Sequence, residues 1–111
     1  MAITRSAKKL VQSALSTSAS AKYTSPANTK TQVTEIWLAN TNTTTARKVT
    51  LYAHGVAAGN TILQDLEITA KGTVILDNCK IVLEATEVLA AKQDAGTDVI
   101  LTAYGIQEVV S

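Results

Sequence analysis

The stretch TQVTEIWLANTNTTTARKVTLYAHG, residues 31–55, decides the fold class of this chain. Its first apolar run places Ile36 and Leu38 on one face, and its second run does the same with Val49 and Leu51. A spacing of two is typical of strands that bury one face. The Asn/Thr run between them predicts a hairpin loop, with the second strand returning antiparallel to the first. Two such strands bury a single face, so the rest of the chain must supply a second layer.

Turn residues divide the remainder of the chain into further short strands. We expect these strands at residues 22–25, 63–69, 73–76, 80–83, 87–93 and 97–110. Gln64-Asp65 is a candidate bulge, Asp94-Ala95-Gly96 a hairpin turn, and Gly105 a point of bulging or close backbone approach. About eight strands at spacings of roughly 8 to 12 residues predict an all-β fold, a single antiparallel, jelly-roll-like β-sandwich.

The first 21 residues have a different pattern from the rest. Their apolar residues recur near a period of 3.6 and are Ile3, Ala7, Leu10, Val11, Ala14 and Leu15. This spacing predicts a short amphipathic helix, and an extended arm is the alternative. A Ser/Thr/Ala tract at residues 16–21 would then act as a flexible tether. We therefore divide the chain into residues 1–21, the arm or helix, and residues 22–111, the β-sandwich domain.

Composition narrows the classes of partner. The chain has 111 residues, which suits one domain, and a formal net charge of +1 with 17% charged residues. This balance provides no general attraction to nucleic acid or to an anionic membrane, so neither is an expected partner. No apolar run approaches the roughly 20 residues that cross a bilayer, and we expect a soluble chain. The single Cys79 cannot form an internal disulfide, which favours assembly in a reducing cytoplasm.

Residues able to carry chemistry are few and scattered. His54 is the only histidine and Cys79 the only cysteine, whereas a structural zinc site takes four ligands. Asp65 and Glu67 lie two residues apart, but the calcium-loop pattern of alternating acids ending in glycine is missing. Structural roles explain each of these groups better than catalysis does. We expect no catalytic residues, no metal site, no cofactor and no enzymatic activity.

Apolar residues on the second faces of strands indicate an interface instead. Trp37 and Tyr52 lie opposite the core-facing residues of their strands, and in the expected hairpin they pair across it. They favour a subunit contact, with a sugar-binding platform as the alternative. The last strand is apolar on both faces, as expected of a central or interfacial strand. The interface candidates are Leu10, Val11, Trp37, Tyr52, Ile100, Tyr104 and Ile106.

Four segments together carry a resemblance to known proteins. They are YTSP at 23–26, VTEIWLANT at 33–41, VTLY at 49–52 and VILTAYGIQE at 99–108. In this pattern the chain resembles the small β-sandwich virion structural proteins of tailed bacteriophages and prophages. The resemblance covers about residues 22–110 and consists of strand patterns, without a catalytic or ligand-binding motif.

The resemblance implies a non-enzymatic virion protein that is assembled in the cytoplasm of the bacterial host. Proteins of this kind decorate or stabilise heads, or form tail tube, connector or baseplate components, commonly as trimers or rings. The implied partners are copies of the chain itself and other phage head or tail proteins, and head decoration is the favoured role. A carbohydrate-binding or receptor-binding module, based on Trp37 and Tyr52, is the second hypothesis. An enzyme built around His54, Cys79 and a carboxylate is the third.

Overall fold

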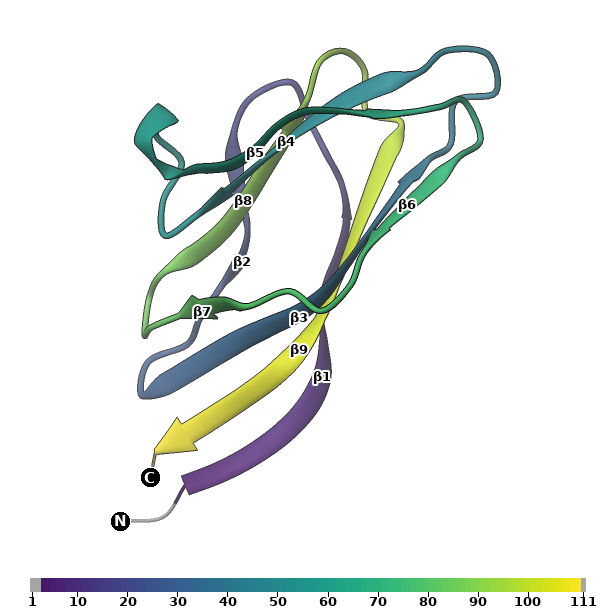
Figure 1. Ribbon diagram of the computed structural model, residues 1–111. Coiled ribbons are helices and arrows are strands. Elements are labelled where there is room, and N and C mark those ends of the chain that lie inside the picture. The colour runs from purple at the N-terminus through teal and green to yellow at the C-terminus, as the bar shows by residue number, and fades with distance from the viewer. Residues whose placement is uncertain (1–2, 111) are drawn as a thin grey trace.

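The computed structural model describes residues 3–110 and contains two antiparallel sheets packed together (Figure 1). Sheet A has the strand order β1, β9, β3, β6, with β7 also paired to β3. Its strands are β1 (Ile3–Ala14), β3 (Thr29–Asn40), β6 (Thr73–Leu76), β7 (Ile81–Leu83) and β9 (Val99–Val110). Sheet B, in the order β2, β8, β4, β5, comprises β2 (Ser20–Thr24), β4 (Arg47–Ala53), β5 (Thr61–Ile68) and β8 (Val88–Gln93). The 3-10 turn η1 (Ala58–Asn60) precedes β5. The expected all-β sandwich is confirmed.

Most connections cross from one sheet to the other. Only β4 to β5 and β6 to β7 join strands of the same sheet within residues 3–110. Because β6 and β7 both pair with β3, they act as one interrupted strand. Two four-stranded layers linked by crossing connections form the double-sheet arrangement of a jelly roll.

The expected hairpin between β3 and β4 is wrong, because these strands belong to different sheets. Asn40, which is 2% exposed, fixes the crossing chain from inside. Its Nδ2 donates to the carbonyl oxygens of Thr45 and Ile68, each at 3.0 Å, and its Oδ1 accepts the N–H of Asn42 at 3.0 Å. A buried amide at the end of β3 that satisfies carbonyls of the connecting loop and of sheet B stabilises the crossing. The expected hairpin turn at residues 94–96 is wrong for the same reason, since β8 and β9 lie in different sheets.

The predicted helix at the N-terminus is also wrong. Residues 3–14 form β1, which pairs with β9 from Ile3 opposite Val110 to Ala14 opposite Ile100. A register shift between Lys9 and Val11 marks a bulge in this strand. Adjacent Leu10 and Val11 therefore both pack against the core, which explains the apolar spacing that resembles a helix. Strand pairing continues past the predicted tether, since β2 already begins at Ser20.

The core lies between the sheets and is built from aliphatic side chains. Its fully buried large residues include Leu15, Ile36, Leu38, Leu51, Ile68, Leu83, Leu89 and Leu101. Two local expectations are confirmed. The register of β5 with β4 shifts between Leu66 and Leu63. Asp65, which lies between them, has a positive φ of 54°, consistent with the predicted bulge. At Gly105 an added Cβ would lie 2.2 Å from the carbonyl oxygen of Gln32, so the two backbones approach closely.

Candidate functional site

The outer face of sheet A carries most of the exposed apolar surface. Seven of the nine large hydrophobic residues that are exposed among residues 3–110 lie on its strands. They are Ile3, Trp37, Ile75, Val82, Tyr104, Ile106 and Val110, and we call them the apolar face. Soluble monomers rarely expose a contiguous apolar patch that is larger than a few hundred Å². The apolar face is therefore the first candidate for a binding surface.

Strand register places these side chains on one side of the sheet. Trp37 pairs with Ile75 on β6 and with Thr102 on β9, and paired residues of antiparallel strands point to the same side. Tyr104 lies two residues beyond Thr102 and shares that side. A second row of partners joins Val82 and Ile106 through Gln32. The face thus spans β6, β7, β3 and β9, with the polar Gln32, Glu35 and Thr102 among its apolar side chains.

Three of the sequence-predicted interface residues lie within the apolar face. Trp37 and Tyr104 are each 40% exposed and Ile106 is 38% exposed. The indole N–H of Trp37 donates to the carboxylate of Glu35, which holds the ring at the surface. Ile100 is half-buried on the same side of β9.

The other three predicted interface residues lie elsewhere. Leu10 and Val11 pack against the core from β1. Tyr52 is 5% exposed and lies in sheet B, so its predicted pairing with Trp37 across a hairpin is wrong. Ile75 and Val82 were not predicted from the sequence, although alternation along 73–76 places Ile75 opposite the core-facing Val74 and Leu76.

The outer face of sheet B is different. Lys48 pairs with Glu67, and Thr50 pairs with Lys92, which alternates with the core-facing residues of β8. Among the residues described, Ile62 on the edge strand β5 is the only exposed large hydrophobic residue on a strand of sheet B. Sheet B therefore presents far less exposed apolar surface than sheet A.

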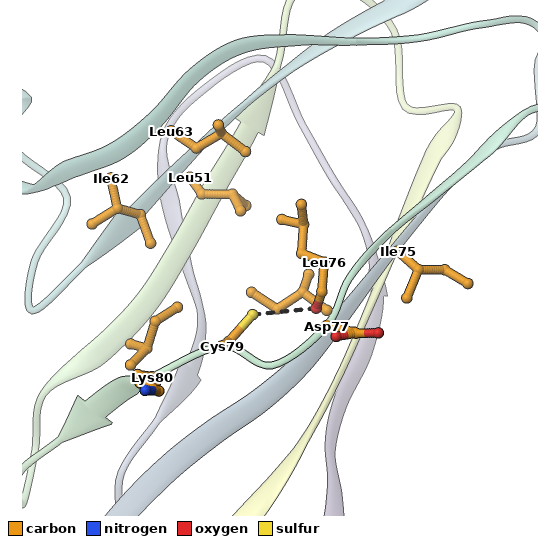
Figure 2. Close-up of a pocket in the computed structure, with 10 residues that line it drawn as sticks. Leu51, Ile62, Leu63, Ile75, Leu76, Asp77, Cys79 and Lys80 are labelled. Carbon is orange, nitrogen blue, oxygen red and sulfur yellow. Dashed lines mark hydrogen bonds between the residues drawn. The ribbon is translucent and has the colours of Figure 1, made fainter.

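A second feature is a cleft of about 490 Å³ between the two sheets, next to β6 (Figure 2). Its walls are aliphatic and include Leu51, Leu63 and Leu76, with Asp77 and Lys80 as its charged residues. Cys79 points into the cleft, and its Sγ donates to the carbonyl oxygen of Leu76 at 3.2 Å. Burial, followed by the nearby Asp77 charge, raises the pKa of the thiol, so it stays protonated at neutral pH.

His54 contacts the carboxylate of Glu87 outside this cleft. Its Nδ1 lies 3.0 Å from a carboxylate oxygen of Glu87, which also accepts the backbone N–H of Glu84 at 2.7 Å. The Glu84 N–H, followed by the His54 side chain, lowers the pKa of Glu87. His54 directly follows β4, whereas Cys79 lines the cleft, and the cleft lining does not include His54.

Two further searches of residues 3–110 gave a negative result. No group of three or more His, Cys, Asp and Glu side chains is placed to hold a metal ion. No helix in that part of the chain combines the length and apolarity needed to cross a membrane.

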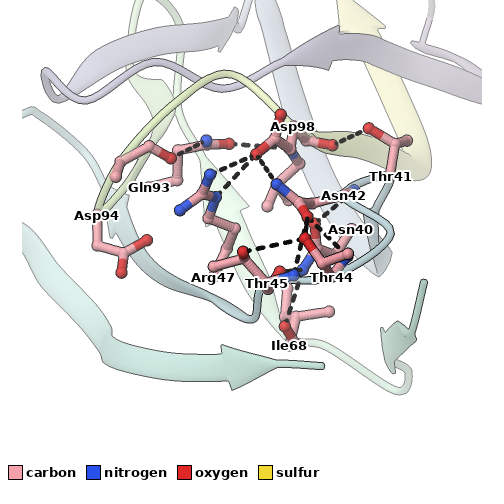
Figure 3. Close-up of polar contacts among 12 residues, drawn as sticks. Asn40, Thr41, Asn42, Thr44, Thr45, Arg47, Ile68, Gln93, Asp94 and Asp98 are labelled. Atoms are coloured by element: carbon pink, nitrogen blue, oxygen red, sulfur yellow. Dashed lines mark hydrogen bonds and ion pairs between the residues drawn. The ribbon is translucent and has the colours of Figure 1, made fainter. Parts of the chain in front are cut away.

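A polar cluster ties together the connections at one end of the sandwich (Figure 3). Asp98 accepts from Arg47 at 2.8 Å and from the side chain of Asn42 at 3.1 Å. The backbone carbonyl of Asp98 accepts the hydroxyl of Thr41 at 2.7 Å. The Asn42 hydrogen bond, followed by that of Arg47, lowers the pKa of Asp98. The cluster therefore links the connection between β3 and β4 to the connection between β8 and β9, both of which cross between the sheets. We call it the polar clamp.

No protein-family model matches the chain, and a search of curated proteins finds no relative.

Proposed function

We propose that the chain is a non-enzymatic structural protein of a tailed-phage virion, which self-associates and docks on the capsid or tail. Head decoration or stabilisation is the favoured role, with a tail tube, connector or baseplate component as the alternative. The apolar face of sheet A is the observation that carries the proposal. Its aromatic residues, Trp37 and Tyr104, are of the types enriched in protein interfaces, and its aliphatic residues add apolar area around them.

Other features of the molecule agree with a structural role. The sandwich is held by a continuous aliphatic core and the polar clamp, and the Arg47–Asp98 and His54–Glu87 contacts tie loops together. The strand pattern of the chain resembles phage virion proteins over about residues 22–110. A rigid unit with one apolar face is suited to bury that face in a symmetric assembly.

The carbohydrate-binding hypothesis has less support than it had from the sequence. It needed Trp37 and Tyr52 to form one aromatic platform, but Tyr52 is buried in the other sheet. A sugar site would now depend on Trp37 with Tyr104 alone.

The test compares self-association and virion incorporation of two matched variants. Trp37→Lys combined with Ile106→Lys places two charges on the apolar face, and Ala21→Lys combined with Thr24→Lys places two at exposed positions of β2 on the outer face of sheet B. We expect sedimentation velocity to show oligomers for the wild type and the sheet B variant, and monomers for the sheet A variant. Immunoblots of particles purified from the induced host should show the same order of incorporation.

Two results would reject the proposal. One is a wild-type protein that remains monomeric at high concentration and is missing from purified particles. The other is equal incorporation of the sheet A and sheet B variants, since the apolar face would then have no part in assembly.

A further inference from the structure

The four free strand edges of the sandwich differ in how they are protected. Natural proteins discourage pairing at such edges with charged residues, bulges and proline. β1 carries Arg5, Lys8 and Lys9 together with its bulge, and β2 carries Lys22 together with a register shift. The edge at β5 carries Glu67 and a bulge with the acidic Asp65.

The fourth edge is formed by β6 and β7 and is interrupted between them, where residues 77–80 include Asp77 and Lys80 and the register with β3 changes. Within β6, which reads TVIL, there is no charged residue, no proline and no register shift. Ile75 is 48% exposed in the middle of β6. Among the described edges, β6 is therefore the segment that is open to another strand.

The pairing with β3 shows which backbone groups of β6 are free. The N–H of Asn40 donates to the carbonyl of Gly72 at 2.9 Å, so residue 72 faces β3. In an antiparallel pair, alternate residues face the neighbour, and Val74 and Leu76 therefore also face β3. Thr73 and Ile75 present their N–H and C=O groups at the open edge.

From this geometry we propose that a second copy of the chain pairs antiparallel with β6, so that two A sheets join across a two-fold axis. The inference rests on the proposed self-association and names the contact that makes it. Thr73 lies opposite the partner's Ile75, Ile75 lies opposite the partner's Thr73, and the two Val74 residues face each other at the axis. The two hydrogen-bonded pairs supply about four backbone hydrogen bonds.

The charges at the ends of β6 favour this register. It places Lys71, just before β6, opposite the partner's Asp77, just after β6, and the two-fold axis repeats the pair. Lys71 and Asp77 have opposite charges, whereas an antiparallel pair of β5 strands would bring acids Asp65 and Glu67 together. An isologous contact of this kind uses the same patch on both copies.

The join also makes the two apolar faces continuous. Ile75 is at once the edge residue and a member of the apolar face, next to Trp37. Pairing through β6 extends this face across both copies on one side of the joined sheet. The paired molecule then offers a doubled apolar surface to a capsid or tail.

Proline substitution tests the backbone contact. The N–H of Thr73 points to the open edge, so Thr73→Pro removes no hydrogen bond within one copy. We expect Thr73→Pro to raise the dimer dissociation constant at least about 10-fold, because the symmetry counts each lost bond twice. Thr73→Ala keeps the N–H and is the matched control, with an expected change within about twofold. Sedimentation equilibrium measures both constants, and circular dichroism checks the fold.

Cysteine cross-linking tests the register independently, including the case in which Thr73→Pro fails to fold. Facing residues of a non-hydrogen-bonded pair have Cα atoms about 4.5 Å apart, within disulfide range. With Cys79→Ser removing the native thiol, Val74→Cys should form a disulfide-linked dimer on mild oxidation. Ile75→Cys in the same background should not, because it faces the partner's Thr73.

The outcomes separate this inference from the proposed function. Cross-linking at residue 74 with weakened association of Thr73→Pro supports the β6 contact. Oligomers that persist in Thr73→Pro, or cross-linking at residue 75 in place of 74, overturn the contact and leave the proposed function standing. A wild-type chain that never associates overturns both.

Discussion

The two aromatic side chains of the defining stretch differ sharply in their surroundings. Trp37, on the outer side of sheet A, is 40% exposed, whereas Tyr52, on the outer side of sheet B, is 5% exposed. Both come from strands with the same alternation of apolar and polar residues. Sheet B covers its aromatic ring within one copy, and sheet A leaves its ring and neighbouring aliphatic residues at the surface. The comparison teaches that surplus apolar surface is concentrated on one sheet and is available to a partner.

The largest expected effect is a difference in stability between these two aromatic positions. Tyr52→Ala should lower the free energy of unfolding by about 3 kcal/mol, because a nearly buried ring leaves a cavity. Trp37→Ala should lower it by less than about 1 kcal/mol in the monomer, since its surface remains largely in water. Urea unfolding at low protein concentration measures both. Equal losses of unfolding free energy in the two variants would contradict the claim that sheet B buries its aromatic ring and sheet A does not.

A second prediction tests how tightly the strand that carries Tyr104 and Ile106 is held. Gly105→Ala should cost roughly 1–3 kcal/mol, because its Cβ would meet the Gln32 carbonyl and force the backbones apart. Gly59→Ala is the control, since an added Cβ there meets nothing within 4 Å. Its expected change is within about 0.5 kcal/mol. Thermal and urea unfolding of both variants would sharpen the comparison, and a neutral Gly105→Ala would contradict the close approach.

The smallest expected effect concerns the polar clamp that holds the crossings between the sheets. Folding lowers the pKa of Asp98, so its stabilising contribution is complete above the unfolded-state pKa of about 3.9. That contribution is lost as the pH falls through the lower folded-state value. Asp98→Asn should therefore flatten the decline in unfolding free energy as the pH falls below about 5. Glu87, whose pKa is also lowered, leaves a residual slope that Glu87→Gln should reduce further. Identical acid profiles for wild type and Asp98→Asn would contradict the clamp.

The sequence predicts strands well because alternation depends on neighbouring residues. The strand at 73–76, the bulge near Asp65 and the close approach at Gly105 follow from local chemistry and are confirmed. The first strand was not predicted, because a bulge places Leu10 and Val11 side by side against the core. A local pattern with adjacent apolar residues fits a helix equally well.

The sheet to which each strand belongs depends on long-range contacts that alternation does not record. The loop after Asn40 suits a hairpin by composition, but the buried Asn40 amide bonds to Ile68 on the other sheet. The predicted pairing of Trp37 with Tyr52 depended on that hairpin and is wrong for the same reason. Tyr104 and Ile106 on β9 are exposed, as their prediction as interface residues requires. Alternation along one strand places them on the same face whichever strands flank it.

The most direct test of the apolar face uses Trp37, the single tryptophan of the chain. Acrylamide quenching of its fluorescence reports how freely water and quencher reach that ring. The account predicts strong quenching in dilute protein and progressively weaker quenching as concentration rises and copies, or added phage particles, cover the face. Quenching that stays the same while sedimentation shows the chain associating would contradict the account, because the partner would then cover some other surface.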